Sequence, residues 1–319
     1  MNFITRSLTL LLICVGAAHA QPAVKPTRLV VGFVAGGPSD LVARIVAQRL
    51  TERTGQSFIV ENRPGATGLI GAEQVAKAPA DGHTLYLASQ TTHAVAPAMY
   101  PNVGFDPIKD FAMIVRVAHN PLLMVTHPSN PFKNFNDVIA LARARPGQLN
   151  YATGGIGSSP HMTMELIKSL TKIDMVPIHY KGDGAAINDM LGARVQIMVA
   201  SIGPLLPHVR NGKLRGLAVT GAKRSAMAPE FPTIAESGLD GFEVTIWFGI
   251  MAPAATPRDI VNRLNSEVLQ AVAQPAVRDQ LLQMGFEIVP NTPDEFAAYM
   301  KQEHARWGKI VKDLNLKAE

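Results

Sequence analysis

The chain has 319 residues, of which 47% are hydrophobic and 17% charged, and its formal net charge at neutral pH is +5. A chain of this length exceeds the usual size of a single hydrophobic core and indicates two domains. Its Lys and Arg residues are scattered, and aromatic residues make up only 6%. The sequence therefore lacks the concentrated basic face that nucleic-acid binding requires. Its mild positive charge is compatible with an anionic ligand.

The N-terminus has the layout of a secretory signal peptide. Arg6 provides positive charge, residues 8–18 form an apolar run, and Ala18-His19-Ala20 has the small-x-small pattern of a cleavage site. The run is shorter than the roughly 20 apolar residues that span a bilayer. We therefore expect cleavage before Gln21, which removes residues 1–20 and places the mature chain in the periplasm without membrane insertion.

The single cysteine, Cys14, raises the alternative of a lipoprotein signal. Bulky Ile13 precedes it, whereas lipoprotein processing sites require a small residue there, so simple cleavage is favoured. The mature chain then contains no cysteine and no disulfide.

Short apolar runs rich in β-branched residues alternate with segments of helical period. Strands are predicted at residues 28–34, 57–61, 84–88, 122–126, 149–153, 175–179, 195–200 and 214–220. Helices are predicted at residues 38–54, 69–77, 135–144, 159–170, 185–191, 257–273, 275–284 and 293–314. This alternation is typical of α/β domains with largely parallel sheets, followed here by a mostly helical C-terminal part.

A unit of strand, glycine-rich loop and helix occurs twice. The first covers residues 30–40 and contains Gly36 and Gly37, and the second covers residues 149–161 and contains Gly154 and Gly157. The repetition predicts two similar halves that face each other. We expect a discontinuous first domain of residues 21–121 plus 221–319 and a second domain of residues 122–220.

Both loops have the chemistry of an anion site. Glycines allow the backbone to approach a ligand, and the free N–H groups of the first helical turn favour a negative charge. Pro38 suits the first turn of one helix, where Asp40 can act as a cap, and Ser158 or Ser159 can cap the other helix or donate a hydroxyl to a carboxylate. Each loop alone is equally well explained as an ordinary turn, but two in mirrored positions favour a binding site.

Other chemistry is poorly supported by these loops. Residues 36–40 lack the lysine of a P-loop, and residues 154–161 do not complete a G-x-G-x-x-G motif, so no phosphate-bearing cofactor is expected. Ser158 and His161 suggest a nucleophile and base, but not in a G-x-S-x-G elbow, and a serine at a helix start is usually a cap. His161 and Glu165 have a spacing that metal ligands use, yet no third ligand joins them, and a polar core contact or ion pair is favoured. We expect no catalytic residue and no metal.

An ordered set of short motifs runs along the mature chain. Its members are Phe33-Val34-Ala35-Gly36-Gly37-Pro38-Ser39-Asp40, Val60-Glu61-Asn62-Arg63-Pro64-Gly65-Ala66, Gly68 to Gly71, Ala80-Asp81-Gly82-His83-Thr84-Leu85, Gly157-Ser158-Ser159-Pro160-His161 with Glu165, Pro177-Ile178-His179-Tyr180-Lys181-Gly182, Asp189 to Gly192, Gly212-Lys213-Leu214-Arg215, Trp247-Phe248-Gly249, Ala252-Pro253 and Thr256-Pro257. In this set the chain resembles the Bug-type extracytoplasmic receptors of tripartite tricarboxylate transporters.

The resemblance implies a type II periplasmic-binding-protein-like α/β fold, with two α/β domains and a ligand cleft between them. It implies a receptor rather than an enzyme, which captures a small carboxylate and delivers it to integral membrane permease subunits. The ligands of such receptors include di- and tricarboxylates, acidic amino acids and aromatic acids. A sensory receptor for a membrane signalling partner stays open as an alternative, because both functions use the same cleft; a secreted serine hydrolase is a weaker alternative.

By position, the resemblance also implies a set of ligand-binding residues whose backbone amides and hydroxyls line the cleft. They are Val34, Ala35, Gly36, Gly37, Ser39, Asp40, Ser89, Gln90, Thr91, Thr153, Gly154, Gly157, Ser158, Ser159, His161, Asp183 and Ser201. The turn at residues 62–65 is interpreted as structural.

Two positions depart from the family pattern, and one tryptophan allows two interpretations. Val34-Ala35 stands where a proline is frequent, and Asp183 stands where a small neutral residue is usual. Asp183 is expected to cap the helix that follows it. If instead it faces the cleft, it would repel a second carboxylate and could pair with an amine or polar N–H group of the ligand. Trp247 is expected in the core, although it could stack on an aromatic acid.

Overall fold

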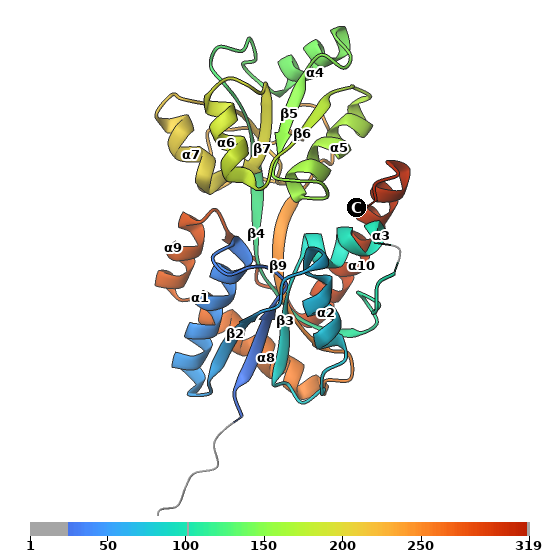
Figure 1. The fold of residues 1–319 in the computed structure, drawn as a ribbon. Helices are drawn as coiled ribbons and strands as arrows, with labels where there is room; N and C mark the ends of the chain where they lie inside the picture. The colour runs from blue at the N-terminus through green and yellow to red at the C-terminus, as the bar shows by residue number, and fades with distance from the viewer. Residues whose placement is uncertain (1–24, 101, 318–319) are drawn as a thin grey trace, which may run out of the picture.

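The computed structural model describes residues 25–100 and 102–317. It shows two lobes stacked end to end and connected by two long strands, β4 (Phe111–Thr126) and β9 (Thr245–Pro253) (Figure 1). The predicted signal peptide, residues 1–20, lies outside the described residues.

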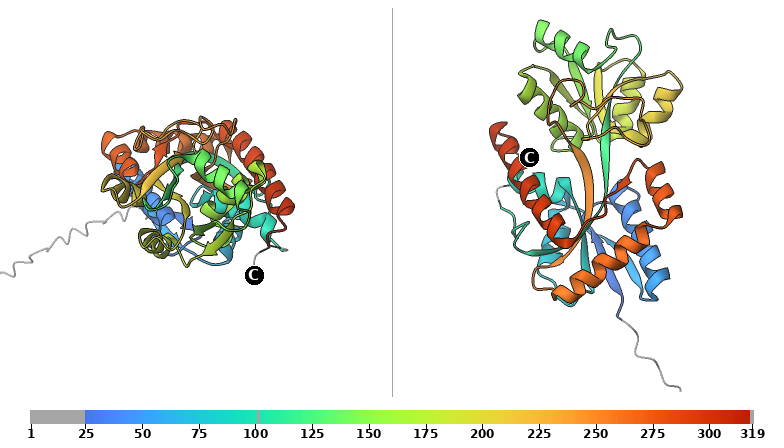
Figure 2. Two further views of the ribbon diagram at one scale, coloured as in Figure 1. Left: turned by 90° about the horizontal axis from the view of Figure 1, so that it is seen from above. Right: turned by 180° about the vertical axis from the view of Figure 1, so that it is seen from behind.

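The first lobe contains both ends of the described chain. Its strands are β1 (Thr27–Val31), β2 (Phe58–Asn62), β3 (Thr84–Ser89) and the short β10 (Glu287–Ile288). Its helices are α1 (Pro38–Thr54), α2 (Leu69–Ala76), α3 (Ala96–Met99), α8 (Arg258–Val272), α9 (Pro275–Gln283) and α10 (Pro293–Asp313), with a 3₁₀ turn η1 (Ala66–Gly68) and a π-helical turn η2 (Thr91–Val95). Seen from behind, α8, α9 and α10 cover one side of this lobe (Figure 2).

The second lobe consists of the middle of the chain. Its strands are β5 (Asn150–Thr153), β6 (Val176–His179), β7 (Ile197–Ser201) and β8 (Arg215–Val219). Its helices are α4 (Phe135–Ala144), α5 (Ser159–Thr171), α6 (Asp183–Leu191) and α7 (Ile202–Arg210). Helix α7 was not predicted, because Pro204 and Pro207 lie within it and proline disfavours a helix interior.

The strands form one mixed sheet with the order β2-β1-β3-β9-β4-β7-β5-β6, while β8 and β10 also pair with β4. The outer groups β2-β1-β3 and β7-β5-β6 are parallel, as predicted. The expectation of largely parallel sheets is wrong at the centre, where β9 is antiparallel to β3 and β4, and β4 is antiparallel to β7 and β8.

Strand β4 passes from one lobe to the other at Pro121. Residues Phe111 to Pro121 pair with β9, and from Leu122 onward the strand pairs with β7 and β8. Proline cannot donate to a ladder, so the prediction started this strand only at Leu122. Strand β9 was missed because it is buried on both faces, which removes the alternating pattern of a half-exposed strand.

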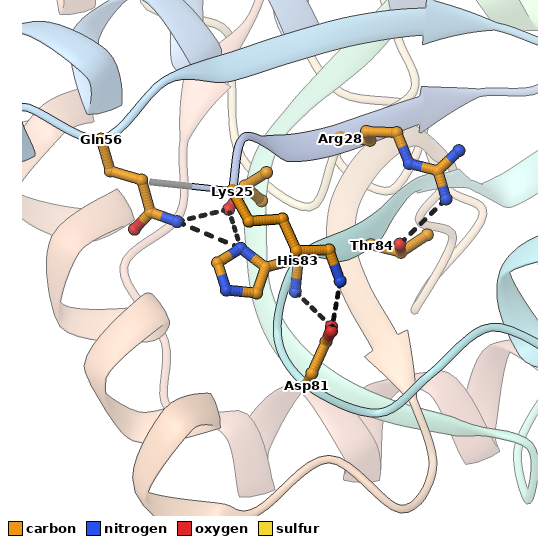
Figure 3. A network of polar contacts seen from close by, with 7 residues as sticks. Lys25, Arg28, Gln56, Asp81, His83 and Thr84 are labelled. Atoms are coloured by element: carbon orange, nitrogen blue, oxygen red, sulfur yellow. Dashed lines mark hydrogen bonds and ion pairs between the residues drawn. The ribbon is translucent and has the colours of Figure 1, made fainter. Parts of the chain in front are cut away.

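A polar network fixes the start of β1 at the end of the first lobe that lies away from the second lobe (Figure 3). Arg28 donates to the hydroxyl of Thr84 (3.2 Å), and Gln56 donates to the hydroxyl of Thr27 (2.8 Å). The amide of His83 donates to Asp81 (2.9 Å), with which Lys25 forms an ion pair. The motif around Asp81 therefore has a structural contact far from the space between the lobes.

One buried carboxylate joins β9 to α10. Glu303, whose side chain is 6% exposed, accepts hydrogen bonds from the indole N–H groups of Trp247 (3.1 Å) and Trp307 (3.0 Å). These are the only two tryptophans in the sequence, and both are fully buried. Trp247 also packs edge to face against Phe296. The core interpretation of Trp247 is confirmed, and stacking of this ring on a ligand is not possible in this arrangement.

Replacing Glu303 with Ala should lower the free energy of unfolding by about 3 kcal/mol, because two buried indole donors lose their acceptor. Urea unfolding followed by tryptophan fluorescence measures this loss, since both fluorophores donate to Glu303. Glu230→Ala removes an exposed carboxylate and should change stability by less than about 0.5 kcal/mol. Equal effects of the two substitutions would contradict this account.

Candidate functional site

The parallel strands of both lobes end toward the space between the lobes (Figure 1). In open α/β sheets, ligands bind outside the carboxyl ends of the strands. The predicted site residues lie at the ends of β1, β3, β5, β6 and β7 or in the loops that follow them. The two glycine-rich loops therefore lie on opposite sides of the space between the lobes.

The loop between β1 and α1 presents exposed backbone. Val34 is 66% exposed, and Ala35 and Gly36 are also exposed. Gly36 adopts a left-handed φ of 84°, which favours glycine. Within the described residues, the first-turn amides of Ser39 and Asp40 have no hydrogen-bond acceptor, as expected for a helix that starts with Pro38 and lacks a side-chain cap.

The buried side chain of Asp40 stabilises this loop by accepting hydrogen bonds. Its carboxylate is 2% exposed and accepts from the Gly36 amide (2.9 Å), Arg44 (2.8 Å) and Asn62 (3.0 Å). Burial raises the pKa of Asp40, but the hydrogen bonds from Arg44, Gly36 and Asn62 outweigh it and hold the pKa below its usual range. Asn62 also donates to the carbonyl of Phe33 (3.0 Å), which confirms the structural interpretation of the turn at residues 62–65. The role of Arg44 was missed, although its spacing of four residues from Asp40 is a sequence signal.

Gln90 makes a direct contact between the lobes. It follows β3 and is fully buried, and its Oε1 accepts from the hydroxyl of Ser159 in the second lobe (2.7 Å). Its Nε2 has no partner within the described residues. Ser89, at the end of β3, contacts the Thr92 hydroxyl at 3.3 Å, and Thr91 begins the π-helical turn η2. Such turns are frequent at functional sites.

The loop between β5 and α5 is held by hydrogen bonds to the first turn of α5. Ser158 is the N-cap and accepts from the amide of His161 (3.4 Å), so the capping prediction is confirmed for Ser158. The Gly157 amide donates to Nδ1 of His161 (3.0 Å). The hydroxyl of Thr153, at the end of β5, contacts Nδ1 of His179 at 2.9 Å, and the two histidine rings stack edge to face with centroids 4.7 Å apart.

This geometry supports neither a nucleophile nor a metal site. Nδ1 of His161 is occupied by the Gly157 amide, and no hydrogen bond joins its ring to Ser158 within the described residues. Glu165 accepts from the Tyr151 hydroxyl and from Lys168 (2.7 Å), which confirms the interpretation of Glu165 as a polar core contact and ion pair. In residues 25–100 and 102–317, no group of three His, Cys, Asp or Glu side chains could hold a metal ion.

Asp183 does not have the predicted capping role. Helix α6 begins at Asp183 itself, two residues earlier than predicted, and its N-cap is Gly182, without a side-chain cap. The carboxylate is half-buried and lies against Gly154, where a Cβ atom would overlap it. Burial raises the pKa of Asp183. The capping expectation is therefore wrong, because the side chain turns toward the neighbouring loop and away from the helix amides.

Ser201 ends β7 beside the crossing of β4 between the lobes. It pairs with Leu122 in the sheet. Neighbouring groups orient the side-chain amide of Asn120. The amide nitrogen then donates to the carbonyls of Pro121 (2.6 Å) and Gly285 (3.0 Å), and the amide oxygen accepts from the Ser201 hydroxyl (3.2 Å). The Ser201 side chain is thus engaged at the connection between the lobes.

A small cavity of about 160 Å³ lies where the second glycine-rich loop meets the first lobe. Ile156, 49% exposed, and Gly157 form one wall, and Thr67, Met99 and Tyr100 belong to the other. Ile156 is not among the site residues expected from the sequence, and a single apolar residue in a loop is not by itself a signal of a site. Within the described residues, no hydrogen bond joins residues 34–40 to the second lobe, so no direct hydrogen bond connects the two glycine-rich loops.

Two α/β lobes joined by crossing strands, with glycine-rich loops facing each other across the gap, define a two-lobed binding protein. The sequence matches the model of the tripartite tricarboxylate transporter family receptor over residues 42–316. The chain belongs to this family. It is accordingly a solute-binding receptor and not an enzyme, and the type II periplasmic-binding fold predicted from the sequence is confirmed.

Individual relatives agree over nearly the whole length. The chain is 35% identical to the protein BugT of Bordetella pertussis over 304 residues, which cover 94% of this chain and 92% of BugT. A Rhodopseudomonas palustris protein solved with adipate is 36% identical, with a TM-score of 0.78, covering 92% of this chain and 98% of that chain. The periplasmic binding protein BugD is 32% identical, with a TM-score of 0.75, covering 92% and 99%. Among the residues that the structure describes, no helix has the length and apolarity needed to cross a bilayer.

The free energy of unfolding should fall as the pH decreases from about 6.5 toward 4, in part because of His161. Burial and the neighbouring His179 lower the pKa of His161 to about 4, below about 6.5 in the unfolded chain. The unfolded state therefore takes up a proton in this window that the folded state does not bind, so the stability present above this window is lost. Urea unfolding across this range should show that the advantage of the wild type over His161→Asn shrinks as the pH falls.

His208→Asn is the control for this measurement, because His208 lies half-buried on α7 and makes no side-chain hydrogen bond within the described residues. Its difference from the wild type should stay constant with pH. A constant difference for His161→Asn as well would contradict the assignment.

Proposed function

We propose that this chain is a periplasmic receptor that captures a small carboxylate between its lobes and delivers it to the integral membrane permease subunits of a tripartite tricarboxylate transporter. The candidate ligands are di- and tricarboxylates, acidic amino acids and aromatic acids. Export through the signal peptide at residues 1–20 would place the receptor in the periplasm. Adipate in the Rhodopseudomonas palustris relative supports a carboxylate ligand.

The observation that carries this proposal is a set of backbone amides without an acceptor in the first turns of two helices, one in each lobe. In the first lobe, the amides of Ser39 and Asp40 have no acceptor within the described residues, and in the second lobe the same holds for Gly184 and Ala185 in the first turn of α6. Two helix N-termini with free N–H groups provide the donors and the dipoles that a carboxylate needs. Hydroxyls and amides of the predicted site residues at the ends of β3, β5 and β7 would complete the site.

The ligand site requires open space at these amides. A Cβ atom on Gly36, Gly182 or Gly184 would meet no atom within 4 Å. The exposed side chain of Val34 and that of Ile156 would contact the apolar part of a ligand, one from each lobe. Asp40 would contribute its amide, since its carboxylate is occupied within the first lobe.

We also propose the domain division expected from the sequence, with residues 21–121 plus 221–319 in one domain and residues 122–220 in the other. The change of partner of β4 at Pro121 and Leu122 supports the first boundary. Strand β8 ends at Val219, just before the second boundary. The two connections would act as the hinge on which the lobes close over the ligand.

A thermal-shift screen of carboxylates tests binding. A ligand at about 100 times its Kd should stabilise the fold by about 2.7 kcal/mol and raise the Tm. Gly184→Leu should abolish the shift, because the new side chain fills the space at the α6 amides without a clash within the chain. Gly308→Leu is the matched control, since Gly308 also lies in a helix with nothing within 4 Å of an added Cβ. A screen without any shift at millimolar acid would refute the proposal.

Closure is a separate prediction. The loops at residues 34–40 and in the second lobe have no hydrogen bond to each other within the described residues, so a ligand that binds both should draw the lobes together. Small-angle X-ray scattering should show a smaller radius of gyration with the ligand identified in the screen. Superimposable curves with and without saturating ligand would exclude closure.

A further inference from the structure

The carboxylate of Asp183 lacks any partner within the described residues. It is half-buried at the start of α6, yet no hydrogen bond and no ion pair reaches it from residues 25–100 or 102–317. The more deeply buried acids in this part of the chain are all partnered. Asp40 accepts from Arg44 and Asn62, Glu165 from Lys168, and Glu303 from two indoles.

An unpartnered carboxylate that is removed from water costs free energy. Burial raises its pKa, and no neighbouring charge of the protein counteracts this effect. Acids in a cleft whose pKa is shifted by burial and that have no structural partner are candidates for a functional role. The carboxylate of Asp183, partly exposed and without a partner among the described residues, is thus free to accept a hydrogen bond from a ligand.

The surroundings of Asp183 place it in the proposed ligand site. It follows β6, whose end faces the first lobe, and its carboxylate lies over Gly154 in the loop that follows β5. A side chain at position 154 would overlap it, so the glycine makes room for the carboxylate on the surface of the loop. On both sides of Asp183, at Gly182 and Gly184, the space is open for at least 4 Å around an added Cβ.

A negative charge at this point selects between ligands. A second carboxylate placed near Asp183 would be repelled, whereas an ammonium group would form a charge-assisted hydrogen bond with it. The free amides in the first turn of α1, in the opposite lobe, favour a carboxylate at the other end of the ligand. The site then offers donors for one anionic end of a ligand and an acceptor for a cationic end.

We propose that Asp183 binds the ammonium group of the ligand and that the receptor selects amino carboxylates over dicarboxylates of the same length. This inference rests on the proposed carboxylate-binding function and names the ligand class within it. It assigns Asp183 as a specificity-determining residue and gives the half-buried carboxylate its missing partner.

Isothermal titration calorimetry at pH 7.5 with matched pairs tests this assignment. Adipate and 6-aminohexanoate differ by the exchange of one terminal carboxylate for a CH2–NH3+ group, and succinate and aspartate differ by an added ammonium group. The wild type should bind the ammonium-bearing member of at least one pair roughly tenfold more tightly or better, as expected for a hydrogen bond to a charged group. Asp183→Asn should lose this preference and bind the dicarboxylates more tightly than the wild type does.

Asp240→Asn is the matched control, because Asp240 is an exposed carboxylate between β8 and β9 and its substitution changes the net charge equally. It should keep the wild-type preference. The Tm of ligand-free Asp183→Asn should equal or exceed that of the wild type, since an unpartnered buried charge is removed. A lower Tm would show that Asp183 has a partner within the fold and would overturn the proposal.

Two kinds of failure are distinguishable. If carboxylates bind but both members of each pair bind equally, or Asp183→Asn leaves the preference unchanged, the assignment of Asp183 is wrong while the receptor function stands. If no carboxylate of either kind binds to any variant, the proposed function itself fails.

Discussion

The antiparallel pairing of β4 with β9 is the constraint on which the rest of the structure depends. These strands pair from Phe111 with Pro253 to Pro121 with Thr245, and β9 also pairs with β3. The pairing connects the parallel strands of the first lobe to the crossing into the second. Because the sheet continues across this connection, the carboxyl ends of both groups of parallel strands are directed at the same space (Figure 1). Without the pairing of β4 with β9, the two glycine-rich loops would not be directed at a common space.

At the gap between the lobes, the polar side chains and the backbone of the loops have different roles. The side chains form hydrogen bonds within their own lobe, whereas some backbone amides have no acceptor. Asp40 is occupied by Gly36, Arg44 and Asn62, and Ser158 and His161 are occupied within their own loop. Polar side chains that are satisfied inside a lobe keep the loops in one conformation, so the unpartnered amides of the first helical turns stay in place for a ligand. Gln90 and Ser159 provide the direct polar contact between the lobes at this level.

Buried Gln90 and partly buried Asp183, both without a full set of partners in the described residues, have opposite chemistry. Nε2 of Gln90 is a donor without an acceptor, and the carboxylate of Asp183 is an acceptor without a donor. Unsatisfied buried polar groups are rare in folded proteins, because each costs free energy. Other buried atoms without a partner, on His93, His119 and Arg306, lie within the first lobe. It is the position of Gln90 and Asp183 beside the gap between the lobes that is consistent with a site completed by a ligand.

The sequence by itself determined the local elements and the kind of loop chemistry. Helices such as α1 and α4 were predicted with their observed bounds, because helical period, prolines and caps are local properties. The order of motifs was sufficient for the family. Strand β9, the part of β4 before Leu122 and the position of the Asp183 side chain depend on residues distant in the chain. These residues are the partners that bury both faces of β9 and pair with the first part of β4, and Gly154, which the Asp183 carboxylate contacts. Only the tertiary structure decided these, because burial and contact between distant segments are not encoded in local periodicity.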